Sequence, residues 1–191
     1  MNKRLGREYF EDLYSQSRDP WSFETSEYER NKYARTLAVL GDRWFGRALE
    51  VGASIGVFTR MLAERCDELL AVDVSEKAVA VARERLREFP GVRVERRSLP
   101  EEMPEGPFDL ILASEILYYF TEGEMLAALH SFEHELSPGG LLLAVHWRRE
   151  TKTYPLQGDE VHELLLRNSR LRHKASIVEE DYRLDLLQDP R

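Results

Sequence analysis

The stretch RALEVGASIGVFTRMLAERCDELLAVDVS, Arg47 to Ser75, decides the fold of this chain. Two apolar runs flank a segment with helical spacing, and a short turn with Gly52 and Gly56 follows the first run. Runs that are apolar at nearly every position are typical of parallel strands that helices cover on both faces. The stretch therefore predicts a β-α-β unit with a glycine-containing turn after its first strand.

The same alternation of apolar runs and helically spaced segments continues along the chain. The last segment, LRHKASIVEEDYRLDLLQ (171–188), instead alternates apolar and polar residues around an acidic turn, as antiparallel strands do. We expect a doubly wound, mostly parallel seven-stranded α/β sheet with an antiparallel C-terminal edge strand. The runs expected as parallel strands are ALEVG (48–52), ELLAVDVS (68–75), VRVERRSL (92–99), FDLILASEILYYF (108–120) and LLLAVHWR (141–148).

The composition favours one soluble domain. A chain of 191 residues fits a single domain, and its formal net charge of -8 gives no basic field for nucleic acid or anionic lipid. The longest apolar runs are far shorter than the roughly 20 residues of a membrane-spanning helix. The N-terminus lacks the apolar segment of a secretory signal, and Cys66 is the single cysteine, so we expect a cytoplasmic protein without internal disulfides. The histidines show no metal-ligand spacing, so no metal is expected.

The glycine-containing turn is the expected ligand site, because ligands of open α/β sheets bind at the carboxyl ends of the strands. A bulky side chain at Gly52 or Gly56 is expected to block that ligand. A dinucleotide-binding turn that starts at Gly52 would need glycines where Ser54 and Val57 stand, which disfavours a pyrophosphate and makes a nicotinamide dehydrogenase a distant alternative. Asp73 ends the next apolar run and is expected beside the turn, where a carboxylate accepts hydrogen bonds from a ribose diol.

The segment EVGASIG, Glu50 to Gly56, resembles the E/D-x-G-x-G-x-G motif of class I S-adenosylmethionine (SAM) dependent methyltransferases, with Ser54 in place of the middle glycine. The resemblance implies that Glu50 and the turn hold the methionine portion of SAM and that Asp73 holds the ribose hydroxyls. The aspartate that often meets the adenine in that family is absent here, which leaves adenine recognition open. The cofactor contacts implied by the resemblance are Glu50, Gly52, Ala53, Ser54, Gly56, Asp73, Val74, Ser98, Leu99, Ser114 and Trp21.

Longer stretches, from about Tyr9 to Leu166, resemble the nodulation protein S (NodS) type of methyltransferase. The motifs at 21–28 and 146–162 carry this resemblance more specifically than the glycine turn. It implies a Rossmann-like methyltransferase fold, SAM as cofactor, and methyl transfer to a small-molecule or oligosaccharide acceptor, with an amino group favoured. Residues 1–45 are then expected to form a helical cap over the active site and residues 46–191 the SAM-binding core. A monomer or a weak dimer is expected.

Methyl transfer requires the acceptor atom, the methyl carbon and the sulfur to lie in line. An amine acceptor must be neutral when it attacks, and a carboxylate or imidazole can take its proton. Glu115 and His146 follow two of the predicted strands at the edge that holds the glycine turn, and they are the candidate bases. Tyr118 and the adjacent Tyr119 are candidates for hydrogen bonds to the acceptor. The aromatic residues expected to close the site are Trp21, Tyr28 and Trp147.

Structural roles and other functions stay open at this point. Asp73 could cap the following helix, although Ser75 fits that role as well. Glu115, His146 and Tyr118 could be structural, as an ion-pair partner, a satisfied histidine and a packing residue. The alternative functions are an O-methyltransferase of a sugar or secondary metabolite and a non-catalytic SAM-binding module.

Overall fold

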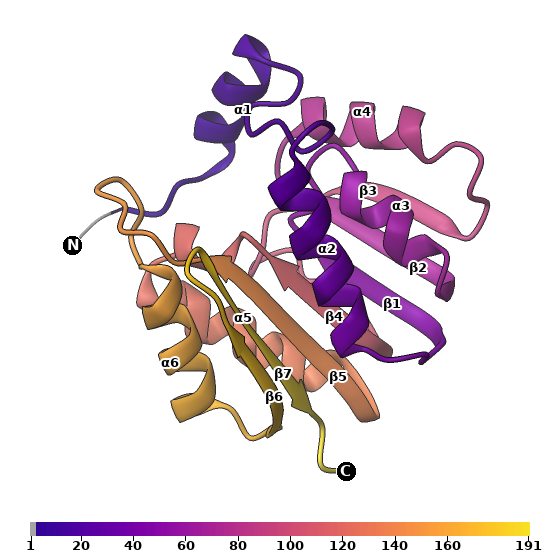
Figure 1. Ribbon diagram of the computed structural model, residues 1–191, viewed down its shortest axis with the longest axis vertical. Helices are drawn as coiled ribbons and strands as arrows, with labels where there is room; N and C mark the ends of the chain where they lie inside the picture. Colours follow the sequence, from indigo (N-terminus) through magenta and orange to yellow (C-terminus); the bar gives the residue numbers. More distant parts are fainter. Residues whose placement is uncertain (1–2) are drawn as a thin grey trace.

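A computed structural model describes residues 3–191, which form an α/β sheet with helices on both faces (Figure 1). Within these residues the sheet has seven strands in the order β3-β2-β1-β4-β5-β7-β6. Strands β1 to β5 run parallel to their neighbours, and β7 runs antiparallel to both β5 and β6. The predicted fold class is confirmed, and the antiparallel strand β7 lies one position inside the edge strand β6. The strands are β1 (Phe45–Val51), β2 (Cys66–Asp73), β3 (Val92–Arg96), β4 (Phe108–Ser114), β5 (Leu136–Trp147), β6 (Arg172–Val178) and β7 (Tyr182–Gln188).

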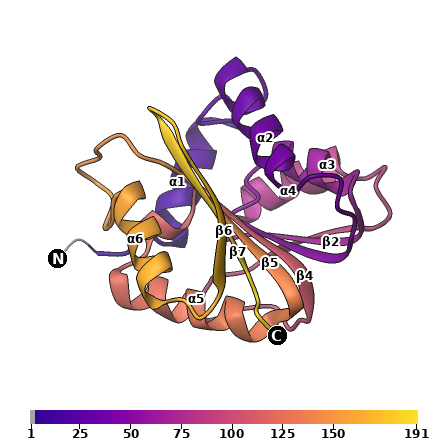
Figure 2. The same ribbon diagram turned by 60° about the horizontal axis from the view of Figure 1, so that its bottom comes forward.

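The helices form two layers around the sheet, as Figure 2 shows. Helices α2, α3 and α4 pack on one face, and α5 and α6 pack on the other. The apolar strand runs are buried on both sides, which explains why they lack alternation. The helical elements are α1 (Arg7–Gln16), α2 (Glu27–Val39), α3 (Val57–Ala63), α4 (Glu76–Arg85), the 3-10 turn η1 (Leu117–Tyr119), α5 (Glu122–Glu135) and α6 (Gly158–Asn168).

Strand boundaries differ from the predicted runs by up to three residues in β1, β2 and β3, and by more in β4 and β5. Strand β4 ends at Ser114, and the aromatic residues that follow form η1 instead of extending the strand. Strand β5 begins at Leu136, five residues before the predicted run, because its first residue pairs with Phe108 across a register shift. Both differences arise from pairing between strands, which the apolar pattern of one run does not encode.

The N-terminal segment crosses the carboxyl ends of the strands. The amide of Leu5 donates to the carbonyl of Tyr119 at 3.0 Å, and the carboxylate of Glu11 accepts the amide of Glu76 at 2.6 Å. These contacts dock the segment onto η1 and onto the start of α4. Strand β1 begins at Phe45, next to the predicted boundary of the N-terminal cap. Residues 1 and 2 of that predicted cap lie outside the described residues.

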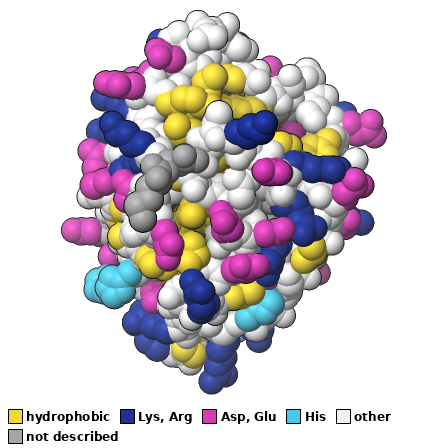
Figure 3. Space-filling model, turned by 90° about the vertical axis from the view of Figure 1, so that its left-hand side faces the viewer, with side chains coloured by type: hydrophobic (Ala, Val, Ile, Leu, Met, Phe, Trp, Pro, Cys, Tyr) yellow, Lys and Arg dark blue, Asp and Glu magenta, His cyan; other side chains and the backbone are white. Residues whose placement is uncertain are grey.

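The surface in Figure 3 carries acidic and basic side chains interspersed with small groups of hydrophobic ones, so this face has no uniform sign of charge. Among the helices of residues 3–191, none has the length and apolar character needed to cross a membrane.

Candidate active site

A cavity of about 370 Å³ lies where the carboxyl ends of β1, β2 and β4 meet the N-terminal segment. The strand order reverses at this point, between β2-β1 and β4-β5, which is where open α/β sheets bind their ligands. Strand ends and the turns after them form its floor, and residues between 4 and 32 form its roof. The predicted site residues on its wall are Trp21, Gly52, Ser54, Asp73, Val74, Leu99, Glu115 and Tyr118.

The glycine turn after β1 has a left-handed backbone at three positions: φ is 81° at Gly52, 52° at Ser54 and 78° at Gly56. Ser54 therefore occupies a conformation that glycine adopts with less strain. A Cβ on Gly52 would lie 3.2 Å from the side chain of Ile116. A Cβ on Gly56 would lie 3.1 Å from Ala82 on α4.

These contacts correct the expectation that a side chain at either glycine would block the ligand. The missing side chain of Gly56 makes room for α4, and Gly56 is not part of the cavity wall. The missing side chain of Gly52 makes room for the turn after β4, while the backbone of Gly52 lines the cavity. Both glycines thus allow close packing against the turn, by the residues after β4 at Gly52 and by α4 at Gly56.

Asp73, at the end of β2, joins the glycine turn to the start of α4. Its Oδ2 accepts the amide of Ser54 at 2.8 Å, and its Oδ1 accepts the amide of Ser75 at 2.9 Å. The helix cap is Ser75, whose hydroxyl accepts the amide of Ala78. Each oxygen of Asp73 keeps a second lone pair that can accept from a ligand. Burial raises the pKa of Asp73, and its backbone hydrogen bonds oppose that rise.

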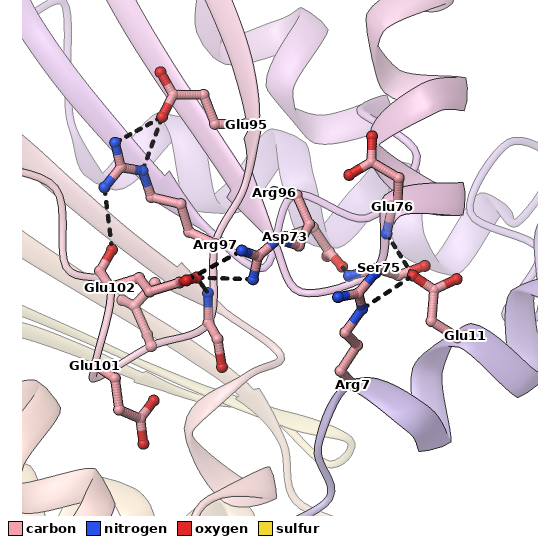
Figure 4. Close-up of polar contacts among 12 residues, drawn as sticks. Arg7, Glu11, Asp73, Ser75, Glu76, Glu95, Arg96, Arg97, Glu101 and Glu102 are labelled. Atoms are coloured by element: carbon pink, nitrogen blue, oxygen red, sulfur yellow. Dashed lines mark hydrogen bonds and ion pairs between the residues drawn. The ribbon is translucent and has the colours of Figure 1, made fainter.

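Figure 4 shows the surroundings of Asp73, with Glu11 of α1 reaching the start of α4. On the other side of Asp73, the loop after β3 divides its residues between cavity and scaffold. Leu99 lines the cavity together with Val74. Ser98 does not: its amide donates to Glu102 at 2.6 Å, and its hydroxyl accepts from Arg4 at 3.0 Å. Arg4 and Arg97 line the cavity as well, so an adenine here would meet basic and apolar side chains.

A smaller hollow of about 30 Å³ adjoins the main cavity and shares Gly52, Ser54 and Glu115 with it. The predicted cofactor residues Glu50, Ala53 and Ser114 line this hollow.

Glu50 is 2% exposed, and among residues 3–191 its Oε2 has no hydrogen-bond partner. Burial raises the pKa of Glu50 to about 8. A buried carboxyl group with one oxygen that lacks a partner, beside the glycine turn, fits a ligand that brings an ammonium group.

Glu115 follows β4 in a left-handed conformation, with φ at 56°. Its Oε1 accepts from the ammonium of Lys32 at 2.6 Å, and its Oε2 accepts from the amide of Trp147 at 2.9 Å. The hydroxyl of Tyr118 also donates to Oε2. Glu115 lines the cavity, but three of its roughly four acceptor positions serve protein donors.

Lys32 and Glu29, both on α2, are site residues that the sequence analysis missed. Lys32 is 2% exposed and bridges Glu115 to Oε1 of Glu29, 3.0 Å away. Burial would lower the pKa of Lys32, but the two carboxylates raise it, so Lys32 is positively charged. The available signal was the helical stripe Glu29, Tyr33, Leu37, which places a charged residue in line with apolar ones.

His146 lies behind the cavity, fully buried and outside its described wall. Its Nε2 accepts the amide of Leu117 at 3.2 Å, so the imidazole proton must be on Nδ1. That proton points to Nε2 of His162, 3.2 Å away, and Nδ1 of His162 lies 2.7 Å from Asp185. The unprotonated nitrogen of His146 is thus occupied, and the candidate role of direct proton acceptor does not fit this geometry.

Aromatic rings form much of the remaining wall. Trp21 stacks on Phe23 with ring centroids 5.5 Å apart and meets Tyr14 edge to face. The hydroxyl of Tyr14 lies 2.5 Å from that of Ser54, so α1 contacts the glycine turn directly. Tyr118 is buried: its hydroxyl donates to Glu115, and its ring packs against His146 and Tyr154. The other aromatic residues on the wall are Phe10, Tyr28, Tyr119, Phe120, Trp147 and Tyr154.

Comparison with known families agrees with this arrangement. A family model described as Nodulation protein S (NodS) matches residues 8–173. Nodulation protein S of Bradyrhizobium diazoefficiens is 36% identical over 134 residues, which cover 65% of this chain and 61% of that protein. Nodulation protein S of Rhizobium tropici is 33% identical over 127 residues, covering 65% and 53%. The chain therefore spans only part of the length of these relatives.

Two solved structures resemble the fold over most of the chain. A Pseudomonas syringae protein is 38% identical, with a TM-score of 0.76 over 85% of this chain and 99% of that one. The N-methyltransferase NodS of Bradyrhizobium japonicum, in complex with S-adenosylhomocysteine (SAH), has a TM-score of 0.83 over 95% and 100% of the two chains. Its identity is 24%, so this likeness concerns the fold alone.

Proposed function

This chain belongs to the nodulation protein S family, and we propose that it is a SAM-dependent methyltransferase that acts on an amino group of a small-molecule or oligosaccharide acceptor. The observation that carries the proposal is the pairing of Asp73 with the glycine turn at the edge of the cavity. The buried Glu50 in the adjoining hollow, whose Oε2 has no hydrogen-bond partner among residues 3–191, supports it. The N-methyltransferase NodS named above, which has the same fold, binds SAH.

SAM supplies a methyl group on a positively charged sulfur, and the chain offers contacts for each part of that molecule. Asp73 has free lone pairs for the two ribose hydroxyls. Glu50 is placed to receive the ammonium of the methionine portion, with Gly52 and Ser54 beside it. Leu99 and Val74 offer apolar contacts to the adenine. The aspartate that the family often uses for the adenine has no counterpart among these wall residues.

The acceptor is proposed to enter between the roof and the turn after β4. Trp21, Tyr28 and Trp147 present aromatic faces there, which attract positively charged groups. Glu29 and Glu115 around Lys32 leave one negative charge in excess at this end of the cavity. Both features favour a cationic acceptor over a neutral or anionic one.

Glu115 and His146 are proposed to position the site and not to carry the proton. Glu115 anchors Lys32 and Tyr118, while His146 fixes the amide of Leu117 in the same turn. Tyr118 thereby has a fixed place in the cavity wall.

The test combines cofactor binding with an acceptor screen. Calorimetry should detect SAH binding, and labelled SAM offered with amino sugars and hydroxylated sugars should yield N-methylated products by mass. Methylation of hydroxyl acceptors alone would favour the O-methyltransferase alternative. Binding of SAH without turnover on any acceptor would favour a non-catalytic SAM-binding module.

A further inference from the structure

Glu29, in the first turn of α2, is a carboxylate on the cavity wall to which the proposed mechanism assigns no ligand contact. It is 9% exposed. The hydroxyl of Ser26 accepts its amide at 3.2 Å and caps α2 at this position. The cap fixes the backbone of this first turn, and Lys32 holds the carboxylate of Glu29 on the cavity wall.

The hydrogen bonding of Glu29 differs from that of Glu115. Oε1 of Glu29 accepts from Lys32, whereas Oε2 lies 2.9 Å from the same ammonium without a hydrogen bond directed at it. Among residues 3–191, Oε2 has no hydrogen-bond partner. A buried acceptor atom that lacks a donor raises the free energy of the site, and a ligand that supplies the donor lowers it.

The charged and titratable groups that face Glu29 are Lys32 and Tyr33 on its own helix, Tyr28 beside it, and Glu115 from the turn after β4. Burial raises the pKa of Glu29, and Lys32 together with a hydrogen bond from Tyr33 opposes that rise. Glu29 therefore takes up a proton more readily than a glutamate on the surface, as an effective general base near neutral pH requires.

We propose that Glu29 binds the ammonium group of the acceptor through Oε2 and removes one of its protons, an inference that rests on the proposed methyltransferase function. In this step an N–H bond of the ammonium breaks, and its electron pair stays on nitrogen. The proton forms an O–H bond with Oε2, so an ammonium and a carboxylate become an amine and a carboxylic acid. The amine then has the lone pair that methyl transfer requires, and Glu29 returns its proton to solvent when the product leaves.

The first test measures binding and does not depend on turnover. With SAH present at about pH 7, glucosamine and glucose are titrated by calorimetry into the wild type, Glu29→Gln and Glu27→Gln. Glu27 lies exposed in the same helical turn, so its variant is the matched control for the change in charge. We expect a preference for glucosamine of about tenfold or more in the wild type and Glu27→Gln, and none in Glu29→Gln. A wild type without this preference, or a Glu29→Gln variant that keeps it, overturns the proposal.

The second test separates proton removal from a structural role. For an amine that the wild type methylates, kcat/KM of Glu29→Gln should fall about 10- to 100-fold at neutral pH. The deficit should shrink above the pKa of the amine, where the acceptor arrives already neutral. An equal deficit at every pH overturns the proton-transfer part.

The variant is expected to fold, because Lys32 keeps its ion pair with Glu115. An SAH affinity of Glu29→Gln within about threefold of the wild type checks this. If the wild type binds SAH but methylates no acceptor, the proposed function fails, while the glucosamine titration still decides whether Glu29 is an ammonium site.

Discussion

Two carboxylates flank the glycine turn, Asp73 at the end of β2 and Glu115 directly after β4, and both strands pair with β1. Asp73 receives only backbone amides from the turns next to it, such as that of Ser54. Glu115 receives Lys32, 83 residues away, and Trp147, 32 residues away. Asp73 thus stays available to a ligand, whereas Glu115 joins α2, β4 and β5. The difference teaches that the hydrogen-bond donors around a strand-end carboxylate decide its role. A carboxylate that accepts only from adjacent turns can still bind a ligand, whereas one that accepts from distant elements holds those elements together.

The largest expected effect is on cofactor affinity, through Asp73. Asp73→Ala should raise the Kd of SAH about 100-fold, or about 2.7 kcal/mol, because two charge-assisted hydrogen bonds to the ribose are lost. Calorimetry at about pH 7 measures it. Asp12→Ala, an exposed aspartate on α1, is the control and should bind as the wild type does. A Kd for Asp73→Ala within about threefold of the wild-type value would remove the ribose assignment.

The second prediction concerns the scaffold side. Glu115→Gln should lower the free energy of unfolding by about 2 kcal/mol, because Lys32 loses one of two charged partners and Tyr118 a charged acceptor. The Kd of SAH should change less than about threefold. Urea denaturation gives the first quantity and calorimetry the second, with the exposed Glu84→Gln as control. Strongly weakened SAH binding with unchanged stability would reverse the roles of the two carboxylates.

The parts of the site that the sequence predicts are those fixed within one β-α-β unit. Asp73, the glycine turn and the Ser75 cap lie within 25 residues of one another, so strand ends and turn geometry place them without knowledge of the remaining chain. In the structure Ser26 caps α2 in the same local way, through the amide of a residue three positions away. Local spacing and capping chemistry are sufficient for such elements.

The parts that the sequence analysis missed depend on how distant elements dock. Nothing in the local sequence around Lys32 or Glu29 reveals that α2 packs against the turn after β4. His146 has the residue type and strand-end position of a base, yet its ring turns toward His162 on α6. The role of Gly56 was also misassigned, because the contact that requires a glycine comes from α4. Each case turns on tertiary packing and not on residue type.

A third prediction concerns Glu50, which is proposed to contact the cofactor as Asp73 does. Unlike Asp73, Glu50 is expected to carry a proton when no ligand is bound. Burial raises the pKa of Glu50 to about 8, so at pH 7 this group is mostly neutral in the free protein. The ammonium of SAH beside it would favour the charged form, so binding should release about one proton at pH 7. Calorimetry in two buffers of different ionisation enthalpy measures the number. Glu50→Gln should release none, and a wild-type value near zero would mean that the ammonium binds elsewhere.

The smallest expected effect concerns the buried histidines behind Glu115. We expect that His146 does not titrate near neutral pH. Burial lowers the pKa of His146 and of His162 below the usual value of about 6.5. The unfolded chain then takes up protons that the folded chain does not, so the stability that these two residues contribute is present above pH 6.5 and decreases as the pH falls.

The C2-proton NMR resonance of His146, assigned with His146→Gln, should stay at the neutral position from about pH 7 to about pH 5.5, because burial holds the pKa of this ring well below its usual value. In the structure, Nε2 of His146 is held by the amide of Leu117 and its Nδ1 proton by His162, so neither nitrogen is open to a proton from the cavity. A shift of the His146 resonance with a midpoint near 6.5 would show that a proton reaches this ring. In that case His146 would return as a candidate base, and the turn after β4 would serve the acceptor as directly as Asp73 is proposed to serve the cofactor.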